Sequence, residues 1–122
     1  MPRGGIAALS AHVGELLVDT AAVTRAEPGA VWILRALHAA PALAHVRLES
    51  HRNVTDRLAA ACAPFLPSVA PEALWHRLRL AVEIGFAVDE MLYEETRIAP
   101  DAALADVAAM LGAALTDLAA PR

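Results

Sequence analysis

The chain has 122 residues, and its ten arginines (there is no lysine) against fourteen acidic residues give a net charge of -4. Apolar residues make up 57% of the sequence, which is too many for a disordered chain, and the length predicts one domain over residues 1–122. A single cysteine, Cys62, excludes a disulfide framework and a cysteine-based zinc cage. The acidic balance argues against direct contact with nucleic acid, which needs a basic face.

Neither a membrane helix nor a secretion signal is expected. The longest uncharged stretch, 58–71, contains Pro64, Pro67 and Pro71 and therefore cannot form a membrane helix of ~20 residues. Near the start, His12 and Glu15 interrupt the apolar run that a signal peptide requires. We therefore expect a cytoplasmic protein.

Alanine and leucine dominate the chain, and no run alternates apolar and polar residues for the length of a strand. Because proline is tolerated in the first turn of a helix, Pro28, Pro41, Pro71 and Pro100 are interpreted as helix starts. The sequence thus predicts an all-α, five-helix bundle with helices over residues 5–25, 28–39, 41–63, 71–98 and 101–119.

The third segment has the pattern of a helix with one buried face. Its apolar positions recur at intervals of three and four, while charged residues occupy the opposite side. The residues expected on its buried face are Leu43, Val46, Ser50, Val54, Leu58 and Ala61.

The fourth segment is apolar nearly all round. It carries one stripe of Leu74, Leu78, Ala81, Gly85, Val88 and Leu92 and a second, offset stripe of Trp75, Val82, Phe86 and Tyr93. Much of the remaining surface is filled by Leu80, Ile84, Ala87 and Met91. Such a helix must be covered nearly all round, and a small domain has too few helices to do this alone. The sequence therefore predicts a homodimer.

The fifth segment repeats this pattern with smaller residues, and Asp101 is its expected N-cap. Glycine at positions 85 and 112 would let a neighbouring helix approach closely. The residues predicted at the dimer interface are Gly85, Val88, Leu92, Leu104, Ala108, Leu111, Gly112 and Leu115.

Catalytic and metal chemistry are not expected. The Glu-x-x-His pattern of a helical di-iron site is absent, and an apolar setting makes Cys62 unreactive. Asp89 and Glu90, with Glu94 and Glu95, resemble an acid/base group, but a charged run near a helix end is usually solvated. We predict no enzyme activity, no metal and no cofactor.

Large side chains instead suggest a pocket for a small hydrophobic effector, formed by the first four helices. Pockets of this kind are mostly apolar with a few polar groups, although for any single aromatic residue core filling is the more common role. His51 is interpreted as a residue at the boundary of the buried face. The predicted ligand contacts are Trp32, Ser50, Val54, Trp75, Phe86 and Tyr93.

Three stretches together suggest a family. Residues 28–37, the Pro41-Ala42-Leu43 junction and residues 49–58 are followed by a long apolar helix and an Ala/Leu-rich final helix. This order resembles the regulatory half of TetR-type transcriptional repressors over residues 5–119. The helix-turn-helix domain of that family is absent from this sequence.

The resemblance implies a C-terminal regulatory domain that dimerises through its last two helices. It also implies that a small effector shifts the orientation of the subunits and so controls DNA binding through the missing domain. Two alternatives remain open. One is a stand-alone helical module for protein–protein interaction without a small-molecule ligand, and the other is a small helical metalloenzyme.

Overall fold

The computed structural model describes residues 33, 35–36 and 39–120, and this part of the chain is helical without any strand. A 3-10 turn, η1 (Pro41–Leu43), leads into α3 (Ala44–Cys62), and a second, η2 (Ala63–Phe65), follows it. Two long helices complete this part, α4 (Pro71–Met91) and α5 (Pro100–Ala119). The all-α prediction is confirmed here, whereas the predicted helix 5–25 and most of 28–39 lie outside the described residues.

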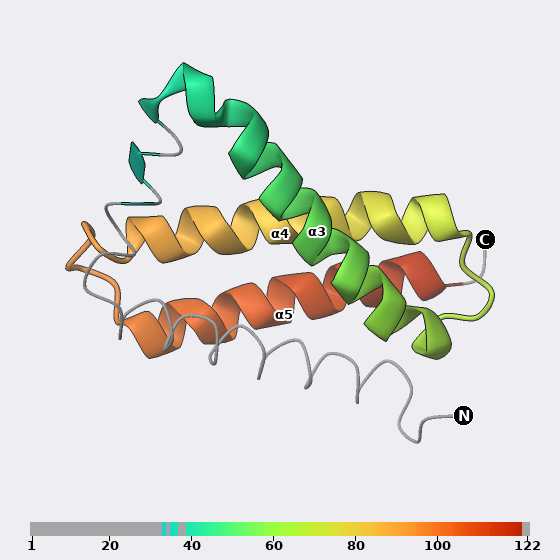
Figure 1. Cartoon of the computed structure of the whole chain (residues 1–122). Helices are drawn as coiled ribbons and strands as arrows, with labels where there is room; N and C mark the ends of the chain where they lie inside the picture. Colours follow the sequence, from blue (N-terminus) through green and yellow to red (C-terminus); the bar gives the residue numbers. More distant parts are fainter. Residues whose placement is uncertain (1–32, 34, 37–38, 121–122) are drawn as a thin grey trace.

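Figure 1 shows α4 and α5 side by side in antiparallel directions, with α3 crossing α4 at an angle. The three helices share a core to which α3, the loop before α4, α4 and α5 each contribute. Its fully buried members are Cys62, Leu66, Leu74, Leu78 and Leu115.

Proline sets the start of three helical elements, as predicted. Pro41, Pro71 and Pro100 each occupy the first turn of their helix, where the missing N–H costs no hydrogen bond. The N-cap of α5 is Ala99, so the prediction of Asp101 as the cap was wrong. Asp101 lies in the first turn instead, where its charge is still favourable for the helix dipole.

The buried face of α3 differs from the predicted one by a rotation of about one residue. Leu43, Val46, Ser50 and Ala61 are exposed, while the buried residues are His51, Thr55 and Cys62. Thr55 is fully buried because its hydroxyl donates to the carbonyl of His51 at 2.7 Å, which satisfies its polar group locally. A prediction based on hydrophobicity alone places polar residues such as His51 and Thr55 on the exposed face of the helix.

Helix α4 ends at Met91, seven residues before the predicted end of its segment at 98. The chain then forms a turn in which the N–H of Tyr93 bonds to the carbonyl of Glu90. Glu90, Glu94 and Glu95 are concentrated here, and a helix C-terminus disfavours negative charge. Negative charge at this point favours an end to the helix, although the apolar residues Leu92 and Tyr93 still follow it.

Candidate functional site

The crossing of α3 and α4 contains a buried histidine. His51 on α3 is only 4% exposed, and its ring stacks on Phe86 of α4 with 4.4 Å between ring centroids and 10° between planes. Its Nδ1 lies 3.5 Å from Glu83 Oε1 but makes no hydrogen bond. The prediction of a boundary position for His51 was therefore wrong, since the residue is central to the contact between the helices.

Glu83 connects this histidine to an arginine. Arg79 Nη2 lies 3.1 Å from Glu83 Oε1, one helical turn away on α4. Burial raises the pKa of the Glu83 carboxyl, but the hydrogen bond from Arg79 and the neighbouring His51 outweigh this effect, and the pKa falls below its usual value. Glu83 is therefore charged at neutral pH.

His51 is shifted toward its neutral form. Burial is the largest cause and lowers its pKa; Glu83 opposes this effect, while Arg79 and Arg47 add to it. Arg47 precedes His51 by one turn of α3, and its Nε is buried without a hydrogen bond. We call Arg47, His51, Arg79, Glu83 and Phe86 the α3–α4 seam.

A second polar contact joins the two helices further along. Trp75 Nε1 on α4 donates a hydrogen bond of 2.8 Å to Asp56 Oδ1 on α3. Trp75 is half-buried. Because its hydrogen bond joins the two helices, it reports on how α3 lies against α4.

Four of the predicted ligand residues are half-buried, and three of them lie on α3 or α4. Val54 lies on α3, and Trp75 and Phe86 lie on α4, where their aromatic rings contact α3. Tyr93 lies beyond α4, and its hydroxyl is buried without a hydrogen bond. Ser50 is exposed, contrary to its prediction in a buried pocket, and Trp32 lies outside the described residues.

A surface hollow lies elsewhere, where the loop before α4 meets the end of α5. Its volume is about 540 Å³. None of the predicted ligand residues lines it; its walls include Ser68, Val69, Ala70, Ala73, Leu118 and Ala119.

The side of α4 away from the core keeps an exposed apolar stripe. Leu80 is 51% exposed, Ile84 44% and Met91 36%, and Ala87 is also exposed. Their spacing of four, three and four places them on one face of the helix. We call these four residues the outer stripe.

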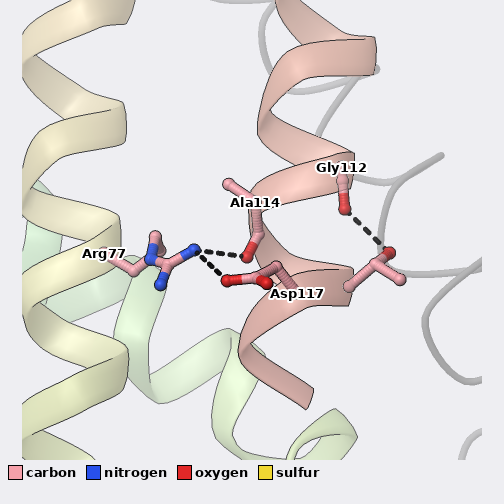
Figure 2. A network of polar contacts seen from close by, with 5 residues as sticks. Arg77, Gly112, Ala114 and Asp117 are labelled. Carbon is pink, nitrogen blue, oxygen red and sulfur yellow. Dashed lines mark hydrogen bonds and ion pairs between the residues drawn. The ribbon is translucent and has the colours of Figure 1, made fainter. Parts of the chain in front are cut away.

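Arg77 ties α4 to the end of α5 beside this stripe. Its Nη1 donates to the carbonyl of Ala114 at 2.9 Å and lies 3.1 Å from Asp117 Oδ2, as Figure 2 shows. Ile84 lies seven residues after Arg77, and Met110 lies seven residues before Asp117 and four before Ala114, which in an antiparallel pair is the same direction along the two helices. Met110 is 64% exposed, and from this spacing we expect it to extend the apolar surface of the outer stripe onto α5.

The residues predicted at a dimer interface lie on other faces. Leu104, Leu111, Gly112 and Leu115 are buried within the single chain, so they are not available to a second copy. The remaining four are half-buried: Gly85, Val88, Leu92 and Ala108. Asp89 also differs from its predicted solvated position, because it is only 8% exposed.

By length and hydropathy, α5 is the one helix in the described part of the chain that could cross a membrane. Its best 18-residue window has mean hydropathy 1.5 and is 33% buried in the structure. The core helix of a soluble protein passes the same test. The described residues contain no group of three or more histidine, cysteine or acidic side chains placed to hold a metal ion.

The features above define an all-helical unit with a polar seam on one side of α4 and an apolar stripe on another. Searches with protein-family models, among curated proteins and among solved structures found no match to this chain.

Proposed function

We propose that this chain is a dimerisation domain that pairs with a second copy of itself through the outer stripe and Met110. The observation that carries the proposal is the stripe itself: three large apolar side chains on α4 are between 36% and 51% exposed on one helix face. Contiguous apolar surface of this kind marks interaction sites in soluble proteins.

The outer face of the α4–α5 pair, which carries the outer stripe, has dimensions suited to a second copy of the chain. Helices of 21 and 20 residues lying side by side offer a surface of roughly 30 Å by 20 Å, or about 600 Å². A stable interface buries ~800 Å² on each partner, and side chains at the rim add to the flat estimate. Two such helix pairs would pack face to face as a four-helix bundle.

The wider role follows the resemblance to TetR-type regulators. In this proposal the domain is the regulatory part of such a protein, and a small apolar effector favours one arrangement of the two subunits over another. The half-buried aromatic residues on the side of α4 that faces α3 support an effector site near the seam. An effector acts only through different affinities for the two arrangements.

Replacing Ile84 with glutamate tests the dimer. We expect the wild-type chain to be a dimer at micromolar concentration in sedimentation velocity experiments. The I84E variant is expected to be a monomer, because it would bury two unpaired carboxylates at the interface. Its helical circular dichroism should be unchanged, since the position is exposed in the single chain.

Val46→Glu is the matched control. Val46 is 42% exposed, close to the value for Ile84, but it lies on the outer face of α3. V46E should remain a dimer. A wild-type chain that is monomeric at high concentration, or an I84E variant that is still dimeric, would overturn the proposal. A monomer that pairs with a different protein through the same stripe would favour the interaction-module alternative.

A further inference from the structure

We propose that the α3–α4 seam is an acid-sensitive contact, in which protonation of His51 breaks its stack on Phe86 and loosens α3 from α4. The seam lies on a different side of α4 from the outer stripe, so this inference does not depend on the dimer.

The burial of His51 makes its charged form costly where it stands. The side chain is only 4% exposed, and the stack on Phe86 keeps water from one face of the ring. An imidazolium in this position would lose its hydration, and the carboxylate that faces its Nδ1, Glu83, lies 3.5 Å away and is shared with Arg79.

The charges around His51 do not compensate for this cost. Arg47 on its own helix and Arg79 on α4 repel a proton on the ring, while Glu83 on α4 attracts it. Glu83 lies closer to Arg79, at 3.1 Å, than to the ring nitrogen, at 3.5 Å. Two guanidinium groups against one carboxylate leave the site already positive before the proton arrives.

The direction of the pH effect follows from this arrangement. The pKa of His51 in the folded chain lies below its ordinary value of 6.5, whereas in a loosened seam the ring would reach water and regain that value. The closed seam is therefore favoured fully above pH 6.5. It loses that advantage as the pH falls from 6.5 through the lower folded value.

Trp75 makes the loosening measurable. It lies on α4 and bonds to Asp56 on α3, so separation of the helices would break this bond and change its fluorescence. The experiment uses a variant chain with Trp32→Phe, so that Trp75 is its only tryptophan. The variant also carries His76→Gln, which removes the imidazole next to the reporter in the sequence. All further substitutions are made in this background.

We expect the emission of Trp75 to change between pH 7.5 and 5, in step with the NMR titration of the His51 ring and with a midpoint below 6.5. His51→Phe in the same background should abolish the change, because phenylalanine keeps an aromatic ring on Phe86 and cannot take up a proton. His45→Gln is the control, since His45 is an exposed histidine on the same helix, and it should leave the change intact.

A second variant keeps the test decisive if H51F does not fold. Glu83→Gln removes the one carboxylate that favours the proton, so the midpoint should move to lower pH. Constant Trp75 emission throughout the His51 titration would overturn the proposal. An emission change that persists in H51F, or a midpoint that stays or rises in E83Q, would do the same.

Discussion

The three buried residues of α3 are His51, Thr55 and Cys62, which are polar or small. Each of them tolerates burial for a local reason. The hydroxyl of Thr55 bonds to its own helix, and the ring of His51 is neutral and stacked. Cys62 is 2% exposed, and burial raises the pKa of its thiol. A buried, protonated thiol behaves as a small apolar side chain.

Cys62 should therefore react with a thiol reagent only when the chain opens. At pH 7.5 we expect the native protein to react with Ellman's reagent at least ~100-fold more slowly than the protein in denaturant, because thiolate formation and access both need local opening. The double variant Ala61→Cys/Cys62→Ala is the control, since Ala61 is the exposed neighbour and its cysteine should react rapidly. Fast labelling of native Cys62 would contradict the burial described above.

At the scale of helices, the sequence predicted beginnings better than ends and faces. Prolines at positions 41, 71 and 100 carry a strong local signal, because the ring excludes most other placements. The end of α4 depends on charge accumulated over several residues, and the buried face of α3 depends on partners in α4. Phe86 as the partner of His51 has no signature in a single sequence, since the two residues lie far apart along it.

The contact between α4 and α5 depends on Arg77. Its guanidinium serves two acceptors at once, a backbone carbonyl and a carboxylate, which a lysine ammonium on a flexible stem does less well. We expect Arg77→Met to lower the free energy of unfolding by about 1.5–3 kcal/mol, the range for hydrogen bonds that involve a charged group, and Arg77→Lys to lower it by less.

Urea unfolding followed by circular dichroism measures these differences. Both variants should be made in the I84E background, so that any loss of dimer does not contribute. An R77M variant as stable as its parent would show that the contact in Figure 2 adds nothing to the packing of α5.

For the whole molecule, the sequence predicted the class of the fold and the excess of apolar surface on its fourth segment. It placed Leu80, Ile84, Ala87 and Met91 only on the surface left between two stripes, and it assigned the interface to other residues. The reason is geometric: α4 and α5 each carry several apolar faces, and only their packing shows which face is used within the chain. Trp75 and Phe86, two of the predicted ligand contacts, lie where α4 meets α3, and the effector site itself stays a prediction.

Among the described residues, helix α3 packs into the core mainly through its second half. Its last turns contribute Cys62 to the core, whereas residues 44–48 are all exposed except for the half-buried Arg47. Backbone amides near Thr55 and Cys62 should therefore exchange with deuterium slowly, and those around Leu48 much faster. In mass spectrometry of peptic fragments, equal protection along α3 would contradict this expectation; a steep gradient would show that the helix unravels from its beginning while the rest of the molecule stays folded.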